Sequence, residues 1–205
     1  LFPIYAETLP KTAAVLHEEG KPWVLDPVAI GMGQMRTDLL TTFKVYKPSI
    51  IRGNASEIIA LAGLWGLEGG SDTSDVRGVD STDSVRSAAP AAVAVARWTG
   101  GAVAISGEED LITDGRQLVF SQGGSEMMPC ITGTGCSLGG VMAVYAAVAD
   151  PFIAAITGSA VYNLAGTRAA AHAKGTGSFQ TDFIDELYVA TPDAIAQNPL
   201  TVEEA

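Results

Sequence analysis

The chain has 205 residues and a mass of 21.1 kDa, which suits one domain with a substantial buried core. Hydrophobic residues make up 47% of it and charged residues 17%, which excludes a chain disordered through high charge and low hydrophobicity. The 12 Lys and Arg against 23 Asp and Glu give a formal net charge of −11, so no broad nucleic-acid-binding surface is expected. A small anionic ligand is still compatible with this charge, because a helix N-terminus binds phosphate without help from net charge.

The cysteine content and hydropathy of the chain limit its compartment. Cys130 and Cys136 are the only cysteines, too few for a disulfide framework or a four-cysteine zinc site. The sequence begins at Leu1 without a basic segment followed by an apolar one, and its most apolar stretch, Val141–Ala149, is too short to cross a bilayer. We therefore expect a cytoplasmic protein with no membrane partner.

Short apolar runs alternate with longer alanine-rich segments along the chain. In chain order, the sequence predicts a helix at Thr8–Glu19, strands at Trp23–Leu25 and Ser49–Ile51, and helices at Ala55–Ala62 and Ala88–Trp98. Three strands follow, at Ala102–Ile105, Leu111–Thr113 and Leu118–Phe120. From Leu138 onward the sequence predicts helices that break at Asp150-Pro151 and at Gly175–Gly177. Asp114-Gly115 indicates a turn between the last two strands. The polar stretch Glu68–Ser87 is predicted to be a surface loop.

The repeated order of strand, polar turn and helix predicts an α/β fold, with a mainly parallel sheet flanked by helices on both faces. We expect residues 1–205 to form a single domain. In this architecture a ligand lies beyond the carboxyl ends of the strands. Four polar segments that follow apolar runs are therefore the candidate site.

The first segment, Gly133-Thr134-Gly135-Cys136, precedes a predicted helix. Glycines there let backbone N–H groups approach a ligand, and the helix start adds partial positive charge, so the segment could hold a phosphate. The glycines alone favour a tight turn with a buried, inert thiol. The cysteine favours a functional interpretation, because a helix start stabilises the thiolate form.

The second segment is Arg52-Gly53-Asn54-Ala55-Ser56-Glu57. Asn54 with Glu57 three residues later resembles a capping box, which predicts that Glu57 turns back to the Asn54 amide. Arg52 at the end of a strand is well placed to bind phosphate oxygens through its forked guanidinium. By itself the segment fits capping and function about equally.

Two further segments have weaker signals. Asp26 ends a predicted strand and could hold Mg²⁺ directly or through water, although a simple turn is the more probable interpretation of Asp26-Pro27-Val28 alone. Ser106 and Gly107 follow another strand and could donate to phosphate oxygens. Without the other segments we would interpret residues 106–110 as a loop.

Together these segments resemble a known enzyme family. Four segments carry the resemblance, in this order: Leu25-Asp26-Pro27-Val28, Ile51-Arg52-Gly53-Asn54-Ala55-Ser56-Glu57, Ile112-Thr113-Asp114-Gly115 and Ile131-Thr132-Gly133-Thr134-Gly135-Cys136. They are similar to segments of the hydroxyethylthiazole kinases, which belong to the ribokinase-like superfamily and serve thiamine salvage. Gly175–Phe179 also resembles a family segment, and the similarity extends from about Leu1 to about Leu187. The Arg-Gly-Asn and Gly-Thr-Gly-Cys segments are specific in combination and weak alone.

The resemblance implies transfer of the γ-phosphoryl group of ATP to the primary alcohol of 4-methyl-5-(2-hydroxyethyl)thiazole. Cys136 falls where this family has its cysteine and where the wider superfamily has an aspartate base. Phosphoryl transfer depends mainly on alignment and charge neutralisation, so a weak base suffices there. We expect Cys136 to position the substrate hydroxyl and to accept its proton late.

The resemblance also implies roles for other residues. Arg52 and Ser106 match ATP-contacting positions, with Ser106 in place of a frequent threonine, and Gly133 matches a thiazole-contacting position. The amides of Gly133, Thr134, Gly135 and Cys136 would form an anion hole, in which each well-placed donor contributes about 3 kcal/mol. Asp26, Asn54 and Glu57 match the positions that arrange Mg²⁺ and its waters around the phosphates.

The resemblance extends to assembly and to the start of the domain. Family members begin with further strands and helices before the position of Leu1, and these contain thiazole-contacting residues, including a methionine. We therefore expect the N-terminal part of the family domain to be absent from this chain. The family is trimeric with active sites at subunit boundaries, so we expect a homotrimer.

Three alternatives are open at this stage. One is a ribokinase-like kinase of another small alcohol, such as hydroxymethylpyrimidine. Another is a catalytically silent nucleotide-binding remnant, and a third is a cysteine hydrolase that uses Cys136, although no histidine follows in a suitable pattern. The kinase interpretation requires that the Gly-Thr-Gly-Cys and Arg-Gly-Asn segments meet at one end of the sheet.

Overall fold

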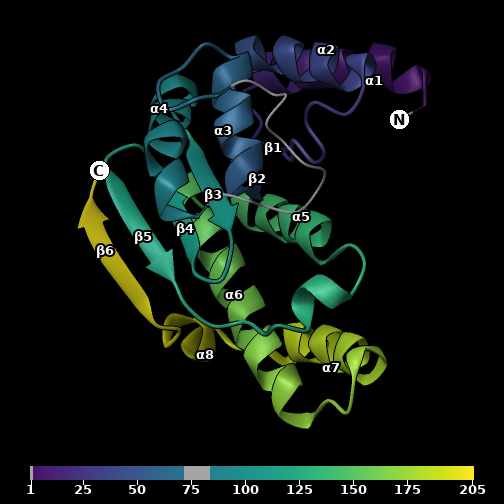
Figure 1. The fold of residues 1–205 in the computed structure, drawn as a ribbon, viewed down its shortest axis with the longest axis vertical. Coiled ribbons are helices and arrows are strands. Elements are labelled where there is room, and N and C mark those ends of the chain that lie inside the picture. The colour runs from purple at the N-terminus through teal and green to yellow at the C-terminus, as the bar shows by residue number, and fades with distance from the viewer. Residues whose placement is uncertain (1, 72–83) are drawn as a thin grey trace.

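A six-stranded sheet with the order β1-β2-β3-β4-β5-β6 forms the centre of the computed structural model, which describes residues 2–71 and 84–205 (Figure 1). The strands are β1 (Val24–Leu25), β2 (Ile50–Asn54), β3 (Ala102–Ser106), β4 (Asp110–Thr113), β5 (Gln117–Ser121) and β6 (Leu200–Glu204). The helices are α1 (Ile4–Glu18), α2 (Gln34–Phe43), α3 (Ala55–Leu64), α4 (Ala89–Thr99), α5 (Thr134–Ala146), α6 (Pro151–His172), α7 (Thr176–Val189) and α8 (Pro192–Ala196). Three short 3₁₀ helices among these residues are η1 (Lys44–Tyr46), η3 (Arg86–Ala88) and η4 (Met128–Cys130).

The predicted α/β class is confirmed, but the sheet is mixed rather than mainly parallel. β1, β2 and β3 are parallel, whereas β4, β5 and β6 each pair antiparallel with the preceding strand of the sheet. The predicted Asp114-Gly115 turn causes part of this difference, because a tight turn can join only antiparallel strands. The prediction of parallel pairing is correct only for the strands that are separated by helices.

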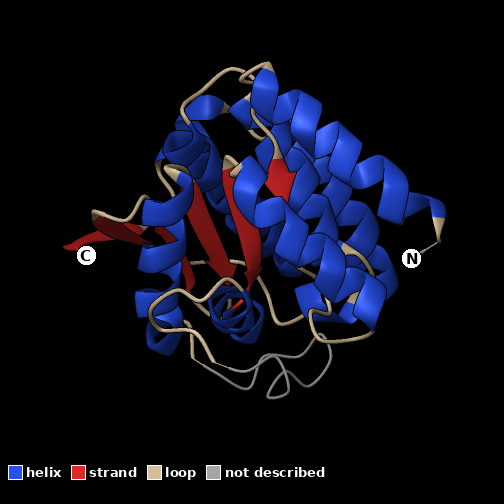
Figure 2. Cartoon of the chain, turned by 90° about the horizontal axis from the view of Figure 1, so that it is seen from above, coloured by secondary structure: helices blue, strands red, loops and turns tan. Residues whose placement is uncertain are grey.

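Helices cover both faces of the sheet, as predicted, except at β6, which projects beyond them at the C-terminus (Figure 2). Ile51, Val103 and Leu111 contribute to one hydrophobic core together with residues of α1, α2, α3 and α4. Their neighbours Ile50 and Ile112 belong to a second core with α5, α6 and α7. Successive strand residues face opposite sides of a sheet, so strands buried on both faces read as the continuous apolar runs seen in the sequence.

Most predicted elements appear, with shifted ends. The first helix begins at Ile4 rather than Thr8, and the Thr8 hydroxyl donates to the Ile4 carbonyl at 3.0 Å instead of capping a helix start. Pro10 therefore lies inside α1 and not in its first turn. In the part of the chain that the structure describes, no helix is both long enough and apolar enough to pass through a bilayer.

α2 and β6 were not predicted from the sequence, which indicated a loop at Glu68–Ser87. Of that predicted loop, residues 72–83 lie outside the described residues, and its last residues enter η3. β6 pairs with β5 at the margin of the sheet, where all its residues are exposed (Figure 1). Arg86 connects this margin to the body of the fold, since it pairs with Glu109 at 3.3 Å and Glu203 at 3.2 Å.

Candidate active site

Arg52 lies in the middle of β2 rather than at its end as predicted, and its side chain reaches Asp26 and Ser106 at the carboxyl end of the parallel strands. The parallel register places Arg52 and Asn54 of β2 beside Ala104 and Ser106 of β3. The Arg52 Nη1 atom is 3.1 Å from Asp26 Oδ2, just after β1, and its Nη2 atom is 3.0 Å from Ser106 Oγ. The Arg52 side chain is 7% exposed, so neighbouring strands hold this cation in a fixed position with little access to water.

The start of α5 presents backbone N–H groups at the same end of the sheet. Gly133 precedes the helix with φ +88°, a conformation that favours glycine. The first helical hydrogen bond runs from the Ser137 N–H to the Gly133 carbonyl at 2.8 Å. The N–H groups of Thr134, Gly135 and Cys136 precede that bond and therefore have no acceptor within the helix. Together with the helix dipole, they make this turn suitable for an anion.

Arg52 lies directly against this helix start. A Cβ atom built on Gly135 would be 3.1 Å from Arg52 Nη1, and one built on Gly139 would be 3.6 Å from Arg52 Cδ. The two glycines thus give the arginine room to lie beneath the first turns of α5. The expected meeting of the Gly-Thr-Gly-Cys and Arg-Gly-Asn segments is confirmed, because the guanidinium of Arg52 lies next to Gly135.

The two side chains of the Gly-Thr-Gly-Cys turn differ in their surroundings. The Thr134 hydroxyl lies 3.0 Å from the Met128 carbonyl and 2.9 Å from the Ile131 carbonyl, so it holds the preceding turn in place. Cys136 is a free, exposed cysteine in the first turn of α5. Its exposure contradicts the alternative of a buried, inert thiol and leaves the sulfur accessible to a ligand.

Glu57 and Asn54 form the capping box that the sequence predicted. The Glu57 N–H donates to Asn54 Oδ1 at 2.8 Å, and the Asn54 N–H donates to Glu57 Oε2 at 2.9 Å. The other carboxylate oxygen, Oε1, accepts the Ala29 N–H at 3.0 Å, across to the segment that follows β1. Burial raises the pKa of Glu57, and Asp26 adds to this rise, while these backbone N–H groups and Arg52 oppose it. Glu57 therefore connects the start of α3 with the segment that follows β1.

The predicted Mg²⁺ residues fit an ion held through its waters better than one bound directly. Asp26 Oδ1 accepts the Val28 N–H at 3.1 Å and its Oδ2 pairs with Arg52, so each of its oxygens already has a partner, as do those of Glu57. Among residues 2–71 and 84–205, no group of three or more His, Cys, Asp or Glu side chains could hold a metal. Carboxylate oxygens keep further lone pairs for metal-bound water, and oxygen donors suit this cation, which retains several waters in proteins.

Arg52 also influences groups that the sequence analysis did not select. Its charge lowers the pKa of Asp110, although burial dominates and raises that pKa to about 6. Burial likewise raises the pKa of Tyr162 on α6, and Arg52 and the hydrogen bond with Ser137 oppose that shift. The Tyr162 hydroxyl donates to Ser137 Oγ at 2.9 Å, next to the anion-binding turn. A charged residue at the start of a buried strand was the sequence signal that could have identified Asp110.

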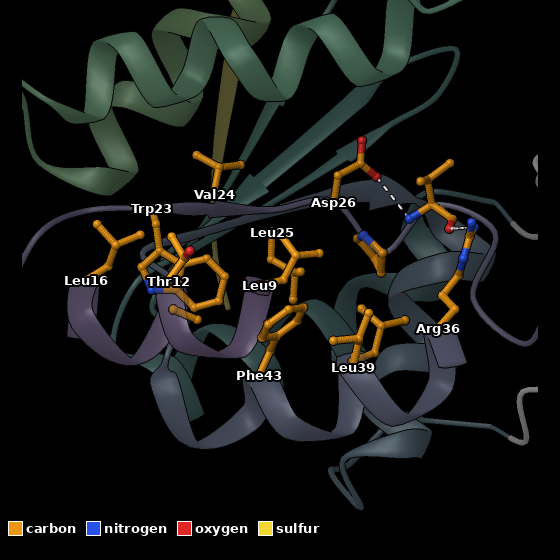
Figure 3. Close-up of a pocket in the computed structure, with 14 residues that line it drawn as sticks. Leu9, Thr12, Leu16, Trp23, Val24, Leu25, Asp26, Arg36, Leu39 and Phe43 are labelled. Carbon is orange, nitrogen blue, oxygen red and sulfur yellow. Dashed lines mark hydrogen bonds between the residues drawn. The ribbon is translucent and has the colours of Figure 1, made fainter. Parts of the chain in front are cut away.

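A cavity of about 370 Å³ adjoins the site on the side of α1 and α2 (Figure 3). Its wall is mainly apolar, with Trp23, Leu39 and Phe43 among the lining residues, and Asp26 and Arg36 lie at one end. Asp26 therefore borders both this cavity and Arg52. A second cavity, of about 510 Å³, lies at the opposite end of β3 and β4, between the turn at Asp114 and the start of α6.

Comparisons with known proteins agree with this geometry. The sequence profile of the hydroxyethylthiazole kinase family matches residues 4–193. A hydroxyethylthiazole kinase of Bifidobacterium longum (strain DJO10A) is 47% identical over 99% of this chain and 70% of that protein. The enzyme of that name from Leptospira interrogans (serogroup Icterohaemorrhagiae, serovar copenhageni) is 46% identical over 89% of this chain and 66% of that protein.

Solved structures show the same relationship. The hydroxyethylthiazole kinase protein of Pyrococcus horikoshii OT3 superposes with a TM-score of 0.83 at 27% identity, covering 100% of this chain and 74% of that one. Staphylococcus aureus pyridoxal kinase, solved in complex with ADP, superposes with a TM-score of 0.61 at 18% identity, covering 98% of this chain and 69% of that one, which shows a shared fold. Because its profile and its relatives agree, the chain belongs to the hydroxyethylthiazole kinase family.

Proposed function

We propose that this chain transfers the γ-phosphoryl group of ATP to the hydroxyl group of 4-methyl-5-(2-hydroxyethyl)thiazole, a reaction of thiamine salvage. Family membership supports kinase chemistry with ATP as co-substrate, and the relatives are named for the thiazole alcohol. The contact between Arg52 and Gly135 is the observation that carries the proposal, because it places a fixed cation beneath a set of outward N–H groups. Phosphoryl transfer needs this combination for the charge that spreads over the phosphate oxygens.

Arg52 and Ser106 would hold the nucleotide phosphates. Asp26 and Ser106 already hold both ends of the guanidinium, so phosphate binding requires little further ordering of this side chain. The N–H groups of Thr134, Gly135 and Cys136 would surround the transferred group, with Gly133 next to the alcohol. Preorganised donors of this kind stabilise a transition state because they need no rearrangement as charge develops.

Cys136 would orient the attacking hydroxyl and accept its proton. It is exposed in the first turn of α5, within the segment that would bind the phosphate. A loose transition state develops little negative charge on the attacking oxygen, so proton transfer can come late and a weak base is sufficient. The two histidines of the chain, His17 and His172, lie in the last turns of α1 and α6 and not in the segment of Cys136, which favours this role over the hydrolase alternative.

Asp26, Asn54 and Glu57 would arrange Mg²⁺ through its water shell. When bound, the ion would neutralise charge between the phosphate groups. We also propose that residues 1–205 act as a single kinase domain, in the cytoplasm and as a homotrimer. Sedimentation analysis of the full chain tests the last point, and a monomer at micromolar concentration would contradict it.

An assay of ADP release tests the reaction. We expect release from ATP and Mg²⁺ with the thiazole alcohol and at least about tenfold less with hydroxymethylpyrimidine, because a matched pocket discriminates by this order. Preference for the pyrimidine alcohol would assign the chain to the other kinase class. Nucleotide binding without release from either alcohol would identify a catalytically silent protein.

Two cysteine variants separate the role of Cys136 from general damage. We expect Cys136→Ala to lower kcat about 100-fold, within the usual contribution of a general base, and to leave the KM for ATP within about threefold. Cys130→Ala is the matched control, because Cys130 is also an exposed free cysteine and precedes the anion-binding turn. Equal losses in both variants, or loss of ATP affinity in Cys136→Ala, would indicate a structural role.

A further inference from the structure

Asn163 is a buried amide in the middle of α6, a helix whose other buried residues are mostly small or apolar. It is 6% exposed, and its two amide hydrogens are both used. Its Nδ2 atom lies 3.2 Å from Asp110 Oδ2 and 3.0 Å from Ser121 Oγ. An amide that satisfies a buried carboxylate in a long helix requires an explanation, because burial of polar groups is unfavourable unless every partner is present.

One side of this contact leads to the proposed nucleotide-binding residues. Asp110 Oδ1 accepts the Gly107 N–H at 3.1 Å, and Gly107 directly follows Ser106. Ser106 in turn accepts the hydrogen bond from Arg52 Nη2. Asn163 therefore holds the carboxylate that fixes the turn directly after Ser106, at the point where β3 ends.

The other side leads to the segment before the anion-binding turn. The backbone carbonyl of Asn163 accepts the Gly124 N–H at 3.0 Å, and the hydroxyl of Thr167, one turn later on α6, accepts the same N–H at 3.0 Å. A Cβ atom on Gly124 would lie 3.3 Å from Asn163 Oδ1, so the backbone passes close to the amide. Residues 122–127 connect β5 with η4, which leads to Gly133. One residue of α6 thus contacts both chain segments that converge on the candidate site.

We propose that Asn163 is a positioning residue for nucleotide binding, acting through Asp110 on the Ser106–Gly107 turn. This inference rests on the proposed function of the site. Loss of the amide would leave the Asp110 carboxylate buried without its side-chain donor, and the turn would move to let water reach it. The apparent affinity for the nucleotide is the quantity that should respond first.

Exchange of the two side chains provides the test. In Asn163→Asp, two buried carboxylates face one another, and we expect the KM for ATP to rise at least about tenfold, as is typical for residues in direct contact. In the double variant Asp110→Asn/Asn163→Asp the pair is reversed: the amide at position 110 donates to the carboxylate at position 163 and still accepts the Gly107 N–H. The Ser121 hydroxyl can rotate to donate instead of accept. We expect its KM for ATP to return to within about threefold of the wild-type value.

A matched control and a second measurement make the result decisive. Ser159→Ala alters another buried polar residue of α6, one turn before Asn163, and should leave both KM values unchanged. The proposal would be overturned if the double variant had a KM for ATP as high as that of Asn163→Asp, or if it failed to fold. A change in the KM for the alcohol alone would also overturn it. If Asn163→Asp does not fold, a folded double variant with a near-native KM for ATP supports the proposal.

Calorimetric titration with ADP and Mg²⁺ separates this inference from the proposed reaction. Wild-type protein that binds ADP but phosphorylates neither alcohol would refute the reaction and still allow the ADP affinities of the variants to be compared. If the wild-type protein binds no ADP, both proposals fail together at the nucleotide. Wild-type turnover with unchanged ADP affinity in Asn163→Asp would refute only the role of Asn163.

Discussion

The two ends of β4 each have an aspartate, and the two carboxylates behave in opposite ways. Asp110, at the start of β4, is buried and contacts Gly107 and the distant Asn163, and burial raises its pKa to about 6. Asp114, just after the strand, accepts the N–H groups of Arg116 and Gln117 at 2.8 and 2.9 Å. Partial burial pushes the pKa of Asp114 up, but these hydrogen bonds outweigh it and lower the pKa below its ordinary value.

The difference between these aspartates reflects the two ends of the sheet. At the carboxyl end, Arg52, Glu57 and Asp110 each have a partner at least 26 residues away in the chain. At the opposite end the partners of Asp114 are two and three residues away, and Arg97 also donates to the Gly115 carbonyl of the same turn. This contrast supports the proposal that the ligand binds at the carboxyl end of the parallel strands.

The largest expected effect is at Arg52, compared with Arg97 at the opposite end. Arg52→Lys cannot contact Asp26 and Ser106 together, so we expect kcat/KM for ATP to fall about 100-fold. Arg97 donates from Nε to the Gly115 carbonyl at 2.7 Å, and Arg97→Lys should remain within about twofold of the wild-type value. Steady-state kinetics with varied ATP decides this, and equal losses would remove the distinction between the two ends.

The next effect concerns the pH dependence of stability. Folded Asp110 holds its proton up to about pH 6, against an ordinary value of 3.8, so between these values the folded state binds more protons than the unfolded state. The free energy of unfolding should therefore fall as pH rises through this window. The contribution of Asp114 to the pH dependence of stability has the opposite sign. Its pKa is lowered, so it contributes stability above its ordinary value of 3.8, and this stability is lost as pH falls below that value.

Urea unfolding at a series of pH values distinguishes the two carboxylates. In Asp110→Asn we expect the decline of stability between about pH 4 and pH 6 to become smaller, since the amide does not titrate, and the part due to the raised pKa of Glu57 to remain. In Asp114→Asn we expect the loss of stability at acid pH to become smaller. Identical pH profiles for the two variants would show that burial does not separate these residues.

Gly135 offers a smaller effect on activity without a loss of stability. Alanine there would place a methyl group 3.1 Å from Arg52 Nη1, and the arginine is already held on two sides. We expect Gly135→Ala to lower kcat/KM for ATP about tenfold. Stability should stay the same or rise slightly, because alanine is favoured over glycine inside a helix by about 1 kcal/mol. A destabilised but fully active variant would contradict the proposed contact.

The substitution Gly115→Ala should lower stability and leave activity unchanged, and its expected effect is the smallest of these. Gly115 has φ +87°, and an added Cβ would lie 2.7 Å from Arg97 Cγ, so alanine is strained in this turn. We expect Gly115→Ala to reduce the free energy of unfolding by about 1–2 kcal/mol. The KM for ATP should not change. Thermal unfolding and kinetics on the same preparation check both statements.

Local patterns predicted the parts of the site that depend on near neighbours. The Asp114-Gly115 turn and the capping box of Asn54 and Glu57 appear as expected, because their partners are at most three residues away. The apolar spacing of Met35, Leu39 and Phe43 could also have predicted α2, which the analysis missed. β6 had no such signal, since its residues are exposed and only pairing with β5 defines it.

The amino-acid sequence alone determined the succession of strands, polar turns and helices, and hence that Arg52, Ser106 and the start of α5 would share one end of the sheet. Parallel strands joined by crossovers bring their carboxyl ends together whatever the details of packing. Only the tertiary structure decided that Asn163 of α6 reaches Asp110 and that Asp110 is shielded from water. The rotation of a helix about its axis and the burial of a carboxylate both depend on side chains far away in the chain, and local spacing contains no information about them.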